Sequence, residues 1–375
     1  MLDQILVPRA YSLAQTFGLD PNEVDPSIET MGYEIPDPST FTDPQMQETA
    51  AFLRAAVPAI DPLYKHRRAI ISDIYYWSNA GDDALLLWGP TGSGKTSAWE
   101  QWCACLGIPL FSIKGHKAFN EWEATGKTDL VDGNTVHTPG PLTLAAQYGL
   151  PVIINEYDRI APAKAIVFND IFEGRPFPVP SNNNMLVEPQ PGFRVVLTAN
   201  TNLVEDPSGN YGTASSHDIS LLERLYSVHV GYPDRDVERA LIEDVMSGVG
   251  DDLLAYWFDQ EGFKVSTPNG LKEGAAITRA EYIDALLDVA HKIRAQSKDG
   301  GSTSDAALER TMSTRILRKW AMHAPAHARA PEKFGMSGLH LTLKKYLSNL
   351  ATQSTSIALH QAVETVFGVG MVLKD

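Results

Sequence analysis

The stretch that decides the fold of this 375-residue chain is Gly89-Pro90-Thr91-Gly92-Ser93-Gly94-Lys95-Thr96. It fits G-x-x-x-x-G-K-[ST], a glycine loop whose backbone N–H groups surround the phosphates of a nucleoside triphosphate. The apolar run 84–88 predicts a buried parallel strand before the loop, and residues 96–106 predict a helix after it. Strand, loop and helix together form the context that the motif needs, which disfavours a chance match.

The motif assigns chemistry to particular side chains. Lys95 would reach the β- and γ-phosphates, and the hydroxyl of Thr96 would bind Mg²⁺. Backbone from Gly89 to Ser97 would hold the phosphates, and the positive end of the following helix dipole would add to the attraction.

Composition narrows the class of protein. With 43% apolar and 21% charged residues, the chain resembles soluble globular proteins, and its length predicts two or three domains. The net charge of −15 disfavours nucleic acid as a partner, although a local basic pore remains compatible with it. The only two cysteines, Cys103 and Cys105, indicate reduced thiols in a cytoplasmic protein. We find no signal peptide and no apolar run of 18 residues, so no membrane segment is expected.

Strands and helices alternate through the first half of the chain, which predicts a doubly wound α/β fold with a parallel sheet. Asp-Gly at 132–133 predicts a hairpin inserted within 125–139, and residues 174–191 predict a loop or a second hairpin. The five expected strands are 84–88, 109–113, 150–156, 193–198 and 227–231.

The chain divides into three regions. Residues 1–65 predict an N-terminal helix (2–17), a Pro/Asp-rich solvated linker (20–44) and a second helix (45–57). Residues 66–232 predict the nucleotide-binding domain. Residues 233–375 predict a mainly helical domain, with a possible hairpin within 248–276 and a flexible loop at 297–305.

Polar residues at strand ends are the catalytic candidates, because ligands bind at the carboxyl ends of parallel strands. Glu156 is placed to orient the attacking water, and Asn200 could hold the same water or sense the γ-phosphate. The alternatives are a capping or solvated carboxylate for Glu156 and a turn residue for Asn200.

The ordered set of motifs resembles the MoxR-like, helix-2-insert group of AAA+ ATPases. Within that group it most resembles the small ATPase subunit of aerobic cobaltochelatase (CobS-like). The resemblance covers most of the chain and is carried by the glycine loop, Asn155-Glu156-Tyr157-Asp158, Thr198-Ala199-Asn200-Thr201, Leu222-Glu223-Arg224-Leu225, Met312-Ser313-Thr314-Arg315, and residues 11–20, 191–194, 211–213 and 366–369.

This resemblance implies roles for further residues. Arg224 matches the arginine finger that acts on nucleotide held by the neighbouring subunit, Arg315 the sensor-2 arginine of a helical lid, and Asn200 sensor 1. Residues 127–139 match an inserted hairpin that faces the ring pore or a partner. ATP and Mg²⁺, a homo-oligomeric ring (a hexamer is expected) and a partner with a von Willebrand A domain are also implied. For both arginines the alternative is a surface ion pair, and Arg310 and Arg318 are local competitors of Arg315.

Two residues depart from the family pattern. Asn155 stands where the family has an aspartate facing Mg²⁺, and an amide brings no charge to a metal that prefers carboxylate and phosphate oxygens. We therefore expect weaker metal retention or slower turnover, with Asp158 close by but not necessarily directed at the metal. Thr314 stands where the family has proline, a change expected to matter little.

Three functions remain open at this point. The leading hypothesis is a ring-forming, ATP-driven remodeller of a partner protein. A nucleotide-gated scaffold with slow hydrolysis is the alternative that Asn155 favours, and a DNA-acting motor is disfavoured by the net charge of −15. The sequence has no cluster of His, Cys or carboxylate at metal-ligand spacing, so the chain itself is not expected to hold cobalt.

Overall fold

The computed structural model describes residues 2–81, 83–204, 206, 211–212, 214, 216–297, 307–330 and 335–372. Thr213 and almost all of the loop expected at 297–305 lie outside these residues. The chain forms two compact units. Unit 1 comprises the chain up to Gly89 and most of residues 94–230, and unit 2 comprises residues from 231 onward together with Pro90–Ser93, the tip of the glycine loop.

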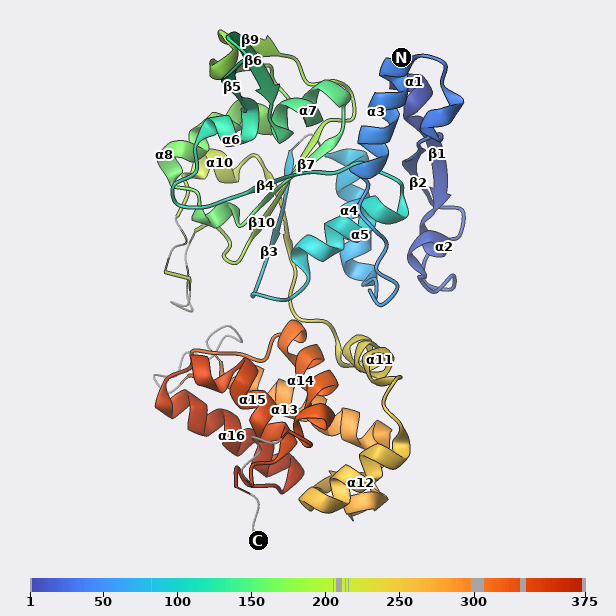
Figure 1. Ribbon diagram of the computed structural model, residues 1–375, viewed down its shortest axis with the longest axis vertical. Helices are drawn as coiled ribbons and strands as arrows, with labels where there is room; N and C mark the ends of the chain where they lie inside the picture. The colour runs from blue at the N-terminus through green and yellow to red at the C-terminus, as the bar shows by residue number, and fades with distance from the viewer. Residues whose placement is uncertain are drawn as a thin grey trace. The chain divides into compact units, whose positions relative to one another are not determined.

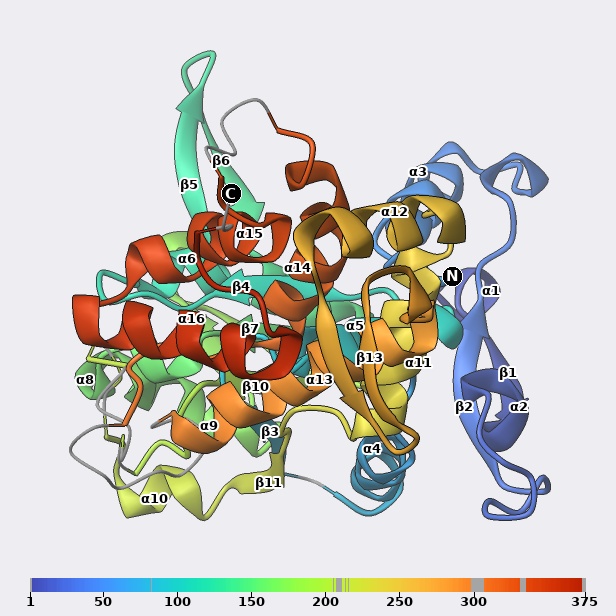
Figure 2. The ribbon, with the colours of Figure 1, turned by 90° about the horizontal axis from the view of Figure 1, so that it is seen from below.

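A five-stranded parallel sheet forms the centre of unit 1, in the order β11-β3-β10-β7-β4 (Figures 1 and 2). This confirms the predicted α/β fold class. The observed bounds are β3 Ala84–Trp88, β4 Phe111–Lys114, β7 Pro151–Asn155, β10 Arg194–Ala199 and β11 Leu225–His229.

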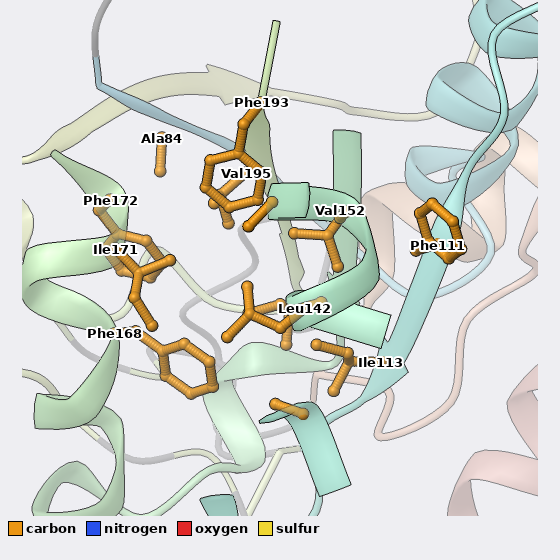
Figure 3. Close-up of a cluster of buried hydrophobic side chains, with 14 of the residues drawn as sticks. Ala84, Phe111, Ile113, Leu142, Val152, Phe168, Ile171, Phe172, Phe193 and Val195 are labelled. Atoms are coloured by element: carbon orange, nitrogen blue, oxygen red, sulfur yellow. The ribbon is translucent and has the colours of Figure 1, made fainter. Parts of the chain in front are cut away.

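Both faces of the sheet are buried. Successive side chains of each strand point to opposite sides, so each strand contributes to two apolar clusters. Leu86 and Val152 belong to one apolar cluster, and Leu85 and Ile153 belong to the other. Figure 3 shows the first cluster, in which Phe168 and Phe172 lie beside Leu142 and Val195. Truncating a fully buried leucine of this kind to alanine typically costs about 2–5 kcal/mol.

Helices on one face of the sheet follow the predicted pattern. The glycine loop leads into α5 (Lys95–Cys105), which packs with α4 (Arg68–Ala80) in the second cluster. On the other face lie α6 (Glu121–Thr125) and α7 (Pro141–Tyr148). The segment that follows β7 on this face is divided into α8 (Pro162–Ala165), η3 (Ile166–Phe168) and α9 (Asn169–Phe172).

Two hairpins project from this second face. The predicted turn at Asp132-Gly133 is present, with φ of 52° and 80°, between β5 (Gly126–Val131) and β6 (Asn134–Pro139). Figure 2 shows this hairpin extending away from the sheet of unit 1. The second hairpin pairs β8 (Phe177–Val179) with β9 (Met185–Val187).

The N-terminal segment is more ordered than its composition predicts. β1 (Val7–Ser12) pairs with β2 (Glu29–Glu34), between the short helices α1 (Leu2–Ile5) and α2 (Leu13–Phe17). The amide of Tyr33 donates to Leu106 O at 2.8 Å. Gly32 permits this approach, because a Cβ there would lie 2.2 Å from Leu106 O. The expected helix over 2–17 and solvated linker over 20–44 are therefore replaced by a ladder joined to the domain, while α3 (Pro44–Ala55) matches the expected second helix.

Unit 2 is mainly helical, and its described residues share one apolar core. The antiparallel pair β12 (Lys264–Thr267) and β13 (Gly270–Glu273) is the hairpin expected within 248–276, whereas the helix before it, α12 (Asp251–Glu261), was not expected. No helix among the described residues is long and apolar enough to cross a membrane. The helices are α11 Arg235–Met246, α12 Asp251–Glu261, α13 Arg279–Gln296, α14 Thr314–His327, α15 Gly338–Tyr346 and α16 Gln353–Phe367.

Candidate nucleotide-binding site

Three neighbouring strands bring the predicted site residues of unit 1 together. β3 leads into the glycine loop, β10 ends at Ala199 just before Asn200, and β7 ends at Asn155 just before Glu156. Because β3, β10 and β7 are adjacent and parallel, their carboxyl ends meet at one edge of the sheet.

The ammonium group of Lys95 is held between two oxygen acceptors. Its Nζ donates to Gly89 O at 2.7 Å and to Asn200 Oδ1 at 3.1 Å, and the residue is 8% exposed. Gly94 caps α5 with φ of 95°, a left-handed conformation that favours glycine. The start of α5 directs backbone N–H groups toward the loop, which is an arrangement that binds phosphate.

A second side-chain group surrounds Asn155. Its Oδ1 accepts hydrogen bonds from Thr96 Oγ1 at 2.8 Å and from Thr198 Oγ1 at 3.2 Å. Its Nδ2 donates to Ser112 Oγ at 3.1 Å. Three hydroxyl groups therefore fix which way the amide faces, and its oxygen is directed at Thr96.

These contacts are compatible with Mg²⁺ beside a bound nucleotide. Because Thr96 directs its proton at Asn155, the lone pairs of its oxygen are available to a metal ion. Asn155 supplies an oxygen but no charge, so the phosphates would provide most of the attraction. The described residues contain no group of three His, Cys, Asp or Glu side chains that could hold a metal ion by themselves.

Glu156 has an unusual backbone conformation, with φ of 55° and ψ of 42°. Its amide donates to Thr198 Oγ1 at 3.2 Å, which helps to hold this conformation. Left-handed non-glycine residues cost free energy and are concentrated at functional sites. The carboxylate lies 3.1 Å from Arg159 Nη1, so its charge is partly neutralised.

Asp158 is a site residue whose role the sequence did not reveal. It is 1% exposed, and its Oδ2 accepts hydrogen bonds from the amides of Asn200 at 2.8 Å and Thr201 at 3.3 Å. Burial raises the pKa of this carboxyl group, while the two amides and Lys95 act in the opposite direction. Asp158 therefore anchors the backbone that carries Asn200, and its position two residues after Glu156 is the only sequence signal of this role.

Arg67 also escaped the sequence analysis. Its guanidinium lies 3.9 Å from the position that a Cβ on Gly94 would take. Burial, and then the positive charges of Lys95 and Arg67, lower the pKa of His229 at the end of β11. Two cations, Lys95 and Arg67, therefore lie beside the glycine loop, where positive charge would attract a polyphosphate.

The two arginines implied by the resemblance lie in different units. Arg224 follows α10 (Ile219–Leu222) in unit 1, where it donates to Ser220 O and, at 2.5 Å, to Glu173 Oε1. Arg315 is the second residue of α14 in unit 2 and is exposed. Within unit 2, a Cβ on Gly92 would lie 2.8 Å from Ser313 Cβ and 3.7 Å from Arg315 Cβ. Arg315 is thus close to the tip of the glycine loop.

A glycine loop with a buried lysine, a threonine hydroxyl directly after that lysine and polar strand ends defines a P-loop nucleoside triphosphatase site. Residues 84–211 match the AAA domain (dynein-related subfamily) family. The matched segment is an AAA ATPase domain, and ATP and Mg²⁺ are the cofactors of that family. The chain is similar to MoxR-like AAA+ ATPases.

Several proteins of known name are similar to this chain. Protein NorQ of Paracoccus denitrificans is 31% identical over 32% of this chain and 45% of its own length. Gas vesicle ATPase GvpN2 of Halobacterium salinarum is 24% identical over 62% of this chain and 75% of its own length. The match thus spans less than half of NorQ. Among solved structures, an ATPase candidate from Cytophaga hutchinsonii covers 85% of this chain and 92% of its own, with 13% identity and a TM-score of 0.38.

Proposed function

We propose that the whole protein binds and hydrolyses Mg-ATP at this site and uses the cycle to remodel a partner protein. The observation that carries the proposal is the pair of contacts at neighbouring strand ends, Lys95 with Asn200 and Thr96 with Asn155. These contacts support the proposal, because they bring a lysine ammonium, a threonine hydroxyl and two asparagine amides to one edge of the sheet.

Each residue then has a distinct task. Lys95 and the loop backbone hold the β- and γ-phosphates, and Thr96 takes one position on Mg²⁺, which neutralises phosphate charge. Glu156 orients the attacking water once its carboxylate turns away from Arg159. Asn200 contacts the γ-phosphate or the same water, and Asp158 keeps it in place.

Two arginines from outside the glycine loop would complete the site. Arg315, which lies in the helical unit 2, would pair with a phosphate of the nucleotide. Arg224 would act on the nucleotide of the next subunit in a homo-oligomeric ring, with six subunits expected. Such an arginine contributes about 10³–10⁵ in rate. In the single chain it pairs with Glu173, so assembly would have to exchange that pair for phosphate.

The partner is proposed from the resemblance to the cobaltochelatase small subunit. It would be a protein with a von Willebrand A domain, met in the cytoplasm, with a metal chelatase as one possible client. The β5–β6 hairpin offers apolar contact area, since Leu130 is 76% exposed and Val136 is 44% exposed. Affinity capture with Glu156→Gln in the presence of ATP should retain this partner, and Lys95→Ala should not.

The direct test combines hydrolysis with assembly. Steady-state phosphate release and the mass in solution would be measured with and without Mg-ATP, using Lys95→Ala as the control. We expect ATP to promote a larger assembly and the rate per subunit to rise with protein concentration. A parent protein that neither binds nor hydrolyses ATP would overturn the proposal.

A nucleotide-gated scaffold is the second candidate, favoured by the uncharged Asn155 and by the Arg159 contact to Glu156. It predicts tight ATP binding and ATP-dependent assembly with almost no phosphate release, which the same experiment distinguishes. A DNA-acting motor is a weaker candidate, because the net charge is −15. A hydrolysis rate that rises on adding DNA would favour it.

A further inference from the structure

We propose that a buried network in unit 2 fixes the direction of Arg315, and that Thr314 is a positioning residue of the nucleotide site. The inference rests on the proposed function, because it concerns how the lid arginine reaches ATP. It departs from the sequence analysis, in which threonine in place of the family's proline was expected to matter little.

The centre of the network is Glu238 on α11, which is fully buried. Arg294 on α13 donates to both of its carboxylate oxygens, at 2.7 Å and 2.8 Å. The hydroxyl of Thr314 donates to Glu238 Oε1 at 2.6 Å. A bidentate contact between a guanidinium and a carboxylate restricts the geometry of both groups. Removing either partner is strongly destabilising, because it leaves a buried charge unpaired.

The network ends at the first turn of α14. Arg294 Nε donates to Met312 O at 2.7 Å, and the Ser313 hydroxyl caps the helix by accepting from the amide of Ile316. Three successive residues, 312–314, are therefore held by side-chain contacts. Arg315 is the next residue, so its starting direction follows from theirs while its own side chain stays exposed.

A proline would restrain the start of α14 through its ring, whereas Thr314 restrains it through a hydrogen bond. Thr314 is the first helical residue of α14, a position where proline is favoured because its φ is already helical. Ser313 has φ of −65° and ψ of 156°, the extended conformation that a following proline would also require. The backbone at residues 313–314 therefore has the conformation that a proline would impose. In this chain the hydrogen bond from Thr314 to Glu238 restrains it instead.

The same ion pair also reaches the glycine loop within unit 2. The guanidinium carbon of Arg294 lies 4.2 Å from the centre of the Tyr232 ring. Tyr232 Oη donates to Thr91 O at 3.2 Å. One buried pair thus contacts both the start of α14 and a residue that holds the loop tip. We therefore expect loss of the Thr314 hydroxyl to misplace Arg315 relative to the phosphates of the nucleotide.

The test compares ATP with ADP, because only ATP offers a γ-phosphate to the arginine. Dissociation constants of fluorescent ATP and ADP would be measured by equilibrium titration of the full chain with Mg²⁺. Thr314→Val should weaken ATP relative to ADP by between about twofold and about thirtyfold, the range for residues that act through a network. Thr314→Ser, which keeps the hydroxyl, should restore the parent ratio.

Controls separate positioning from folding. Lys319→Ala removes another exposed cation from α14, one whose Nζ lies over Tyr346, and should leave the ratio unchanged. Thermal unfolding of each variant identifies loss of stability, which alone would not alter the preference between the two nucleotides.

If Arg315→Ala abolishes the ATP preference and Thr314→Val retains it, the positioning role is overturned. If Arg315→Ala leaves the preference intact, the lid role of Arg315 and this inference both fail. A parent that does not bind ATP would instead overturn the proposed function.

Discussion

The hydroxyl of Thr96 donates a 2.8 Å hydrogen bond to the side-chain oxygen of Asn155. This is the contact that an aspartate at the same position would accept, but the amide makes it without a negative charge. The geometry of the metal-facing pair is therefore retained while its electrostatic attraction is reduced. We therefore expect this relationship to affect the rate of ATP hydrolysis.

Asn155→Asp is expected to lower the Mg²⁺ concentration needed for half-maximal ATP hydrolysis. The Ser112, Thr96 and Thr198 hydroxyls can all donate to the new carboxylate, so the charge is added without a lost partner. Partners of this outer kind affect metal affinity by about 10–100-fold. Asn269→Asp adds the same charge at an exposed turn and is the control. Unchanged Mg²⁺ titrations would mean that the phosphates alone retain the metal.

Glu156→Gln should abolish hydrolysis and leave ATP binding intact. The amide cannot polarise water as a carboxylate does, and such groups contribute about 10²–10⁴ in rate. Phosphate release and fluorescent ATP binding would be measured side by side. Glu309→Gln, at an exposed position, serves as the control. Equal turnover in the variant and the parent would remove Glu156 from the catalytic set.

Arg224→Ala should retain ATP binding and lose the activity that depends on assembly, by up to about 10³–10⁵ in rate. Arg175→Ala is the matched control, because Arg175 also pairs with Glu173 at 2.5 Å. Both variants lose an ion pair with the same carboxylate, but only Arg224 matches the finger motif. Mixing Arg224→Ala with Lys95→Ala subunits would test action across a subunit boundary, and full activity of Arg224→Ala alone would contradict it.

Acid is expected to destabilise unit 2 through a buried histidine pair. His340 and His360 share a 2.7 Å contact between their Nδ1 atoms, with Val369 O and Ser348 Oγ at the outer nitrogens. Burial, and then the charges of His340 and Lys344, lower the pKa of His360 to about 4. Burial also lowers the pKa of His340.

In the unfolded chain a histidine has its ordinary pKa of about 6.5, which is higher than the pKa of these two residues in the folded state. Because the folded state holds the neutral form, this contribution is complete above pH 6.5 and is lost progressively as the pH falls toward 4. The thermal midpoint should therefore decrease across that window. His360→Gln removes one of the two titrating groups and should make the dependence less steep. A parent and a variant with parallel pH profiles would contradict the assignment.

Much of the candidate site was predictable because its signals are local. The glycine loop, the strand-end Glu156 and Asn200, and the Asp-Gly hairpin each follow from a short pattern with a physical cause. The ladder of residues 7–34 was not predictable, because its order depends on a contact to Leu106, more than 70 residues away. The anchoring role of Asp158 likewise depends on the amides of Asn200 and Thr201, which follow β10, a strand distant in the sequence.

The sequence by itself determined the parallel α/β core, the nucleotide loop and the identity of the strand-end residues, since periodicity and motif spacing are encoded within a few residues. Only the tertiary structure decided which way the Asn155 amide faces, because Ser112, Thr96 and Thr198 come from three separate segments. It also decided what Thr314 does, since its hydroxyl meets Glu238, a residue 76 positions earlier in the chain. Hydrogen bonds between distant segments depend on packing, and packing cannot be inferred from a local pattern.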